Sequence, residues 1–454
     1  MASWPTRLEQ TLLGALPERW QKRLRAAHVG HKQVVRAAAW LTLFVLLAKG
    51  IAALKEVAVA YRFGTSAVLE GYLLTFNLGT LPVSLALSIM SAALVPRLVR
   101  QQQGSANGGR EWQRQVTTWV WVGAVLAALV FWLTVPPLIQ AGWLGLGAEG
   151  RQAAQAAVPT MAVVTAFGVV AAWHATQLMS RQRHANTLLE ATPAASILVA
   201  VLLLPGAALD ALLWGTGLGF ALQLMLLAFI VRAARMPVAP GVPRQWPFDR
   251  SLTTRVGWLA AAQALMALGG LVDQVILAHL PPGTLAAFGY ANRVMALVLT
   301  LSASVLGRAL LPVLAGLDQE AARAVARRWA GWMFWLGLVG ALLLALAADP
   351  VVRLIFERGA FSAQDRVATA TLLRWLAMQL PLYLVGAVWV QWLLTQARAG
   401  PVLWWAAVAG VLGKLVVSLG LIHGLGWGGE AVCAGLAAAT LFVYWVLRRY
   451  LKKA

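Results

Sequence analysis

The sequence predicts an all-α polytopic membrane protein with about 12 transmembrane helices, in two six-helix lobes related by a pseudo-two-fold axis along the membrane normal. Hydrophobic residues make up 60% of the 454 residues and charged residues only 12%, whereas about a quarter of a soluble domain is charged. The apolar residues form long runs, and roughly 20 helical residues suffice to cross a hydrocarbon core of about 30 Å. Lys and Arg fall mostly in every second gap between these runs.

The predicted spans follow one another along most of the chain. They cover residues 34–61, 68–96, 116–140, 155–179, 187–205, 208–231, 256–280, 285–314, 329–348, 367–397, 401–423 and 427–447. Strands are excluded as the spanning element, because the runs are too long and too rich in Ala and Leu and do not alternate.

The distribution of basic residues predicts the orientation. With a cytoplasmic N-terminus, about 26 Lys and Arg residues fall in the inner segments and about five in the outer ones, as the positive-inside rule requires. The outer five are Arg62, Arg151, Arg353, Arg358 and Arg366. Both termini are therefore expected in the cytoplasm. The net charge of +21 follows this pattern and forms no single patch, which argues against nucleic-acid binding.

The spans and loops suggest four parts. Residues 1–33 form a cytoplasmic N-terminal segment, in which residues 8–27 have the pattern of a basic amphipathic helix on the inner leaflet; a frayed tail is the alternative. Residues 34–232 form the N-lobe, residues 233–255 a cytoplasmic linker and residues 256–454 the C-lobe.

An internal repeat supports the two-lobed arrangement. Residues 56–72 and 273–290 each begin with an acid, pass through a Gly-Thr turn and reach a Gly-Tyr pair. The two copies are six spans apart, so they have the same orientation. In transporters, such parallel halves move against each other around a site near the midplane.

Charged side chains inside the first predicted span are candidate functional groups, since an unpaired charge in a span costs several kcal/mol. Lys49 and Glu56 are two helical turns apart and are expected on one face, with Lys55 pointing elsewhere. The alternative for each is an internal ion pair that holds helices together.

Candidate charged side chains inside the predicted spans of the second half are Asp273, Arg293, Arg308, Arg374 and Lys414. Most of the charge inside the predicted spans is positive. A cavity lined by Lys49 and Arg293, together with Lys55 or Lys414, would attract an anion and suits a diphosphate headgroup. An internal ion pair again remains an alternative for Lys414.

The sequence lacks the patterns of several enzyme classes. It has no Walker motif GxxxxGK[ST], no HExxH helix and a single cysteine, Cys433, in an apolar run. The six histidines are scattered, and no spacing supports a nucleophile and base. We therefore expect no enzyme activity, no metal site and no resident cofactor.

Three segments carry a family resemblance. They are LLAKGIAALKEVAVAYRFGTSAVLEGYLLTF (46–76), FGYANRVMALVLTLSASVLGRALLPVL (288–314) and IFERGAFSAQD (355–365). In order and spacing they resemble the MurJ/MviN family of lipid II flippases, within the MOP exporter superfamily. The chain is identified as a divergent member from about residue 34 onward.

The resemblance implies a V-shaped helical bundle in the bacterial inner membrane that works by alternating access. It implies that Lys49, Lys55 and Arg293 bind the substrate diphosphate. Glu56 matches the family's acid, and Glu70 stands where the family usually has Asp. We assign Glu56, Glu70, Asp273 and Lys414 supporting or ion-coupling roles. Transport would be driven by membrane potential or an ion gradient, with glycan polymerase or synthase components as candidate partners.

The chain also departs from the family pattern. The paired arginines of the family's second helix have no counterpart in residues 80–96, Asn292 replaces the Asp before Arg293, and the two further C-terminal helices of many members do not follow the twelfth span. The substrate is thus lipid II or another polyprenyl-diphosphate-linked glycan, such as an exopolysaccharide precursor. A cation-coupled small-molecule efflux antiporter and a non-transporting scaffold of a polysaccharide synthase complex remain alternatives.

Overall fold

A computed structural model gives the architecture. It describes residues 47–102, 106–181, 188–204, 208–242, 250–315, 317–394 and 399–453, and these residues form helices and turns with no strand. The predicted amphipathic helix at residues 8–27 and the start of the first predicted span lie outside the described residues.

The first group of helices, which we call the first bundle, surrounds α6. It comprises residues 47–63, α4 (Ala67–Gln102), α5 (Ala106–Gln140), α6 (Ala148–Ser180), α8 (Thr192–Leu203) and α9 (Ala208–Ala233). Helix α6 is buried because small residues let its neighbours approach closely. A Cβ added to Gly71 of α4, for example, would lie 2.1 Å from the carbonyl oxygen of Gly150.

The second group, the second bundle, follows in the chain. It comprises α10 (Arg250–Ala278), α11 (Thr284–Ala315), α12 (Gln319–Phe356), α13 (Ala363–Ala377), α14 (Leu380–Leu394), α15 (Ala399–Leu425) and α16 (Gly429–Lys453). Asp318 caps α12 by accepting a hydrogen bond from the amide of Ala321, and Ser362 and Asp365 form a capping box that starts α13.

The predicted spans agree with the observed helices, with one difference. Each predicted span overlaps a helix, and among the described residues seven helices are long and apolar enough to cross a membrane. The span predicted at residues 367–397 corresponds to two helices, α13 and α14, which are bent by 45° at a short break. This pair would bring the number of candidate spans to eight; α8 and parts of α10 and α11 are shorter apolar helices.

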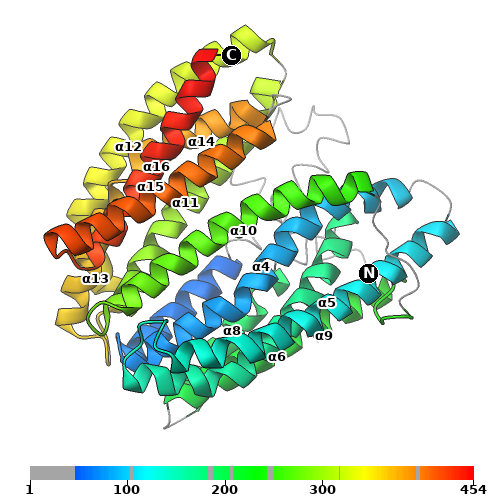
Figure 1. Cartoon of the computed structure of the whole chain (residues 1–454), viewed down its shortest axis with the longest axis horizontal. Helices are drawn as coiled ribbons and strands as arrows, with labels where there is room; N and C mark the ends of the chain where they lie inside the picture. Colours follow the sequence, from blue (N-terminus) through cyan, green and yellow to red (C-terminus); the bar gives the residue numbers. More distant parts are fainter. Residues whose placement is uncertain are drawn as a thin grey trace, which may run out of the picture.

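Figure 1 shows the arrangement of the two bundles. Helix α10 runs beside α4 of the first bundle, whereas the other helices of the second bundle lie close to the first bundle at the end that carries α13 and spread away from it toward the end that carries the C-terminus. We call the close end the outer end, following the orientation predicted by the basic residues. The boundaries predicted for the lobes and the linker remain predictions.

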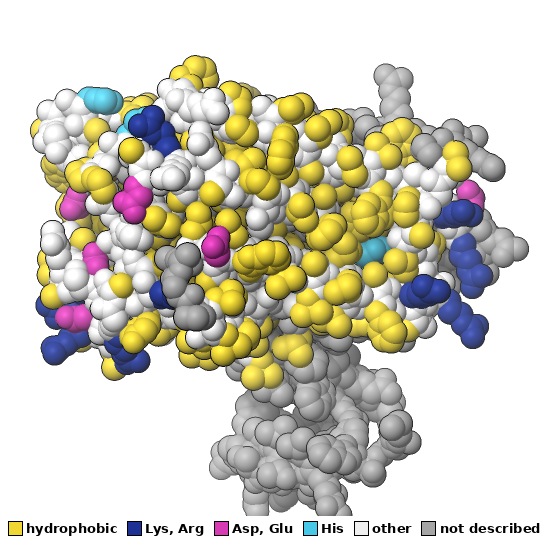
Figure 2. Space-filling view, turned by 90° about the horizontal axis from the view of Figure 1, so that it is seen from below, with side chains coloured by type: hydrophobic (Ala, Val, Ile, Leu, Met, Phe, Trp, Pro, Cys, Tyr) yellow, Lys and Arg dark blue, Asp and Glu magenta, His cyan; other side chains and the backbone are white. Residues whose placement is uncertain are grey.

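The surface has the character of a protein that lies in lipid. Large apolar side chains face outward, including Phe229, Trp332 and Leu346 with exposed fractions of 72%, 72% and 70%. Figure 2 shows apolar side chains covering most of one face, with Lys and Arg gathered toward its two ends. A bilayer would solvate this apolar surface.

Candidate substrate-binding site

A cluster of three charges lies between the two bundles. Glu56, on the helix of residues 47–63, pairs through one oxygen with two cations. Its Oε1 lies 2.5 Å from Nζ of Lys55 and 2.9 Å from Nε of Arg293, which comes from α11. The side chains of Lys55, Glu56 and Arg293 are only 16%, 13% and 30% exposed. We call these three residues the charged cluster.

The charged cluster carries more positive than negative charge. Two cations share one carboxylate, which leaves a formal excess of one positive charge. Nη1 of Arg293 and Oε2 of Glu56 are both buried without a hydrogen-bond partner in the part of the chain that the structure describes. Buried polar atoms normally find a partner, so these two unsatisfied atoms are unusual. An anion placed here would supply acceptors to the free guanidinium nitrogen.

Two neighbouring residues of α11 flank the guanidinium of Arg293. Gly289 lies one turn before it on α11, and a Cβ added there would lie 3.6 Å from Nη1. The ring of Tyr290 lies on another side, with its centroid 5.7 Å from Cζ of Arg293. Gly289 itself places no side chain against Nη1, and the aromatic ring stabilises the cation.

If the turn at Gly64 lies at the boundary of the hydrocarbon core, helix lengths put the charged cluster at roughly half its depth. Glu56 is eight residues before the turn at Gly64, which corresponds to about 12 Å of helix. Arg293 is nine residues into α11, or about 13 Å from its start. Because the hydrocarbon core is about 30 Å thick, both distances put the cluster near the midplane, where transporters bind their substrates.

Lys49 lies apart from the charged cluster. It is exposed on the first helix and close to Glu190, in the turn before α8. The expectation that Lys55 points away from the face of Glu56 was wrong, because Lys55 binds this carboxylate directly. A side chain as long as that of Lys can reach back to an adjacent residue.

Asp273 and Lys414 form a buried ion pair within the second bundle. Nζ of Lys414, on α15, donates to Oδ2 of Asp273 on α10 at 2.8 Å and to the carbonyl of Gly269 at 2.6 Å. Their side chains are 5% and 6% exposed. The structure thus gives this pair a helix-joining contact, and its ion-coupling role stays a prediction.

Glu70 connects the two bundles. It lies in the first turn of α4 and is 6% exposed. Its Oε1 accepts hydrogen bonds from the amides of Leu285 and Ala286, at 2.8 and 3.2 Å. These amides belong to the first turn of α11, so a carboxylate of one bundle caps a helix of the other.

Further contacts close the outer end. The hydroxyl of Thr65 donates to Asp365, and the amide of Ala360 donates to the carbonyl of Tyr61 at 2.7 Å. The turn at Gly64 has a φ of +53°, and a Cβ there would lie 2.5 Å from the carbonyl oxygen of Ala360. We call these contacts, together with those of Glu70, the outer closure.

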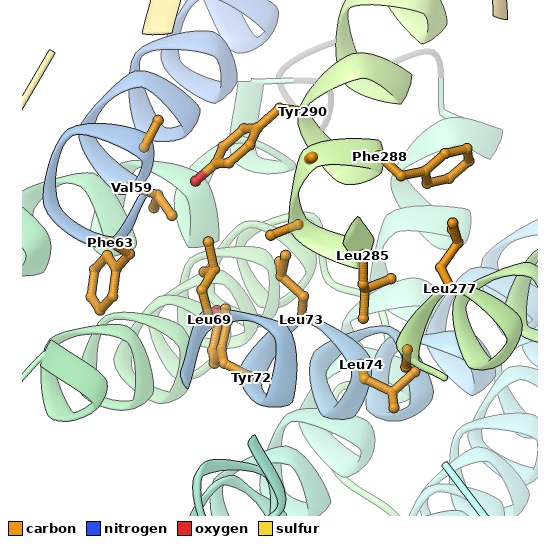
Figure 3. Packing of buried hydrophobic residues seen from close by; sticks show 14 of the residues in the cluster. Val59, Phe63, Leu69, Tyr72, Leu73, Leu74, Leu277, Leu285, Phe288 and Tyr290 are labelled. Carbon is orange, nitrogen blue, oxygen red and sulfur yellow. The ribbon is translucent and has the colours of Figure 1, made fainter. Parts of the chain in front are cut away.

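The repeated Gly-Thr turns meet at the outer closure. Gly283 has a φ of +90°, and a Cβ added to it would lie 3.1 Å from Oγ1 of Thr65. Beneath the turns, apolar side chains of four helices pack together, with Val59, Leu73, Leu277 and Tyr290 among them (Figure 3). The outer end is therefore sealed by both polar and apolar contacts.

Sequence reasoning missed several residues that join the bundles. Nδ2 of Asn77 on α4 donates to Oε1 of Gln274 on α10 at 2.7 Å, and neither residue carries a charge that would single it out. Asp365 had a local signal, since Ser362 and Asp365 have the spacing of a capping box. That signal indicates a helix start and says nothing about a contact with Thr65.

The two-bundle helical fold is shared with solved structures of membrane proteins. The fold matches a solved structure titled as a lipid II flippase MurJ in an inward closed conformation, with a TM-score of 0.77, 16% identity and coverage of 91% of this chain and 87% of the other. It also matches an inward-facing multidrug resistance MATE family transporter of the MOP superfamily, with a TM-score of 0.70, 14% identity and coverage of 90% and 95%. At these identities the likeness concerns the fold alone.

The chain belongs to the MurJ lipid II flippase family, whose sequence pattern matches residues 59–454. A curated relative, described as a probable lipid II flippase MurJ from Bdellovibrio bacteriovorus, is 29% identical over 178 residues. The match covers 38% of this chain and 34% of that relative. The chain thus spans about a third of the length of the first curated relative it matches.

Proposed function

We propose that this protein moves a polyprenyl-diphosphate-linked saccharide, lipid II or a related cell-envelope or exopolysaccharide precursor, from the inner to the outer leaflet. The observation that carries the proposal is the charged cluster, in which Arg293 keeps a buried guanidinium nitrogen without an acceptor. A diphosphate offers several oxygens with the geometry and charge that a guanidinium and an ammonium bind. Family membership supports the same substrate class.

Alternating access follows from the positions of the charged cluster and the outer closure. The bundles are joined at the outer end, and the helices of the second bundle other than α10 diverge from the first bundle toward the other end (Figure 1). The headgroup would enter from the divergent end and replace Glu56 at Arg293 and Lys55. Freed from its two cations, Glu56 would leave the interface between the bundles less firmly held. The outer closure could then open and release the headgroup on the far side.

We propose the bacterial inner membrane as the location, with both termini in the cytoplasm, on the strength of the distribution of Lys and Arg. Membrane potential or an ion gradient would drive the cycle, and no resident cofactor is required. The candidate partners are membrane lipids and glycan polymerase or synthase components.

The test is replacement of the cluster cations in a bacterium depleted of its own lipid II flippase. Lys55→Gln and Arg293→Gln should each abolish growth rescue while the protein reaches its normal membrane level, with Arg151→Gln, an exposed residue, as control. Rescue by both cluster variants as good as that of the parent would overturn the proposal. If the unmodified protein does not rescue growth but supports normal export of another lipid-linked glycan, lipid II is excluded as the substrate and the related precursors remain.

The contacts of the acids argue against the antiporter alternative. A cation-coupled efflux pump needs acidic groups available in its central site. In the part of the chain that the structure describes, Asp273 is bound to Lys414, Glu70 caps α11 and Glu56 holds two cations. An anionic substrate fits this arrangement better than a cationic one.

A further inference from the structure

Tyr290 lies between the charged cluster and the outer closure and contacts both. It is fully buried on α11, one turn before Arg293. Its ring faces the guanidinium of Arg293 at 5.7 Å, and its hydroxyl donates at 3.0 Å to the carbonyl of Gly64 in the first bundle. Figure 3 shows the side chain reaching from α11 toward the helix that carries Val59.

The ring of Tyr290 also packs on the outer loop of the second bundle. Its centroid lies 5.0 Å from that of Phe356 and 5.5 Å from that of Phe361. These two rings lie at the end of α12 and in the loop that follows, next to Ala360, whose amide bonds to Tyr61. Tyr290 therefore contacts both sides of the outer closure at once.

We propose that Tyr290 is a positioning residue that couples anion binding at the charged cluster to opening of the outer closure. The inference deepens the proposed transport function and rests on it. It is carried by the geometry of one side chain that touches Arg293 with its ring and Gly64 with its hydroxyl.

The coupling follows from the rigidity of a helix. Tyr290 and Arg293 are three residues apart on α11, so they lie on neighbouring turns of one face and move together. When an anion draws Arg293 away from Glu56, α11 shifts or rotates with it. Because the bond from Tyr290 to Gly64 is already 3.0 Å long, a displacement of about 0.5 Å takes it to the limit of a hydrogen bond. The carbonyl of Gly64 then loses its partner, which favours separation of the bundles and access of water.

The test compares two tyrosine variants that lose the same atom. Tyr290→Phe keeps the ring and removes the bond between the bundles. Tyr72→Phe removes an equally buried hydroxyl, whose bond to Thr216 at 2.7 Å lies within the first bundle. The two changes should cost similar stability, and only the first should change the outer closure.

The readout is the distance between spin labels at the outer end, measured by pulsed electron resonance in lipid nanodiscs without substrate. Labels at Trp143→Cys and Leu354→Cys, which are 70% and 71% exposed and belong to different bundles, are placed in a Cys433→Ala background. Tyr290→Phe should raise the ratio of separated to closed molecules about ten-fold, the effect of one lost buried hydrogen bond. Tyr72→Phe should match the parent.

Two results decide the proposal independently of transport. Equal distance distributions in Tyr290→Phe and Tyr72→Phe would overturn it, provided both variants are monodisperse. Because no substrate is present, a protein that failed to flip any glycan could still show the expected shift. Adding undecaprenyl diphosphate to the parent should lengthen the distance, and an unchanged distance together with measured binding would also overturn the coupling.

Discussion

Replacing Glu70 by Ala should weaken the outer closure more than any other single truncation there. The carboxylate is 6% exposed and binds two amides at the start of α11 from the opposite bundle. Truncation removes both acceptors and leaves the amides of Leu285 and Ala286 buried without partners. When the bundles separate, water can bind these amides, so the truncation destabilises only the closed state.

The expected magnitude follows from these contacts. A hydrogen bond to a charged group contributes about 1.5–3 kcal/mol, and a negative charge at a helix N-terminus adds about 0.3–1 kcal/mol. Since the two bonds share one oxygen, Oε1, they are not independent. We therefore expect about 2–4 kcal/mol, which raises the ratio of open to closed molecules roughly 30- to 1,000-fold. Glu70→Gln retains an acceptor and should give a smaller effect.

The assay is alkylation of a buried cysteine by a membrane-impermeant maleimide. Ala287→Cys, in a Cys433→Ala background, introduces a thiol at a position on α11 that is 2% exposed. Its labelling rate should rise in proportion to the open fraction. Asp318→Ala is the matched control, because it removes the N-cap of α12 without affecting a contact between the bundles. Equal labelling rates in the Glu70→Ala variant, the control and the parent would show that Glu70 does not hold the outer closure.

Three further outcomes follow from named contacts. Lys414→Ala should destabilise the protein by about 3–5 kcal/mol in thermal unfolding, because Asp273 is left as a buried charge. Adding Asp273→Asn should recover part of the lost stability, and no recovery would contradict the pairing. Thr65→Val removes the donor to Asp365 and should speed labelling of Ala287→Cys about five-fold, which corresponds to the loss of about 1 kcal/mol from one hydrogen bond. An unchanged labelling rate would show that this bond does not hold the outer closure. Gly64→Ala should destabilise the closed state by at least about 1–2 kcal/mol, since the residue has a φ of +53° and its Cβ would meet Ala360. An unchanged labelling rate of Ala287→Cys would contradict the close approach.

The helices could be predicted from the sequence because a bilayer demands long apolar segments. Each predicted span overlaps an observed helix, and the repeated Gly-Thr turns proved to be neighbours. The break between α13 and α14 could not be found in this way. Residues 376–384 read LAMQLPLYL, apolar enough on both sides of Gln379 to pass for one continuous run. Pro381 has no amide hydrogen to donate to the carbonyl of Ala377, so it interrupts the helix at this point, and hydropathy does not report this effect.

The candidate site could be predicted only in part. Charge inside a span singled out Lys55, Glu56 and Arg293, and the structure brings these three together. Charge inside a span could not distinguish these three residues from Asp273 and Lys414, whose charges neutralise each other within the second bundle. Pairing depends on which helices are neighbours, and helical periodicity gives only the face of each residue.

The neutral partners of the site carried even less signal. The connection of Tyr290 to Gly64 joins residues that are 226 positions apart, and the bond of Asn77 to Gln274 spans 197 positions. Tyrosine and asparagine are ordinary residues in such segments. Their roles emerge from the meeting of two bundles, for which no local pattern exists.

The unsatisfied guanidinium of Arg293 should bind a diphosphate, and native mass spectrometry measures the affinity of the protein for undecaprenyl diphosphate. Arg293→Gln should weaken binding about 10- to 100-fold, the effect of losing charge-assisted hydrogen bonds of about 1.5–3 kcal/mol. Arg151→Gln should leave binding unchanged. An affinity of the Arg293→Gln variant equal to that of the parent would contradict the account.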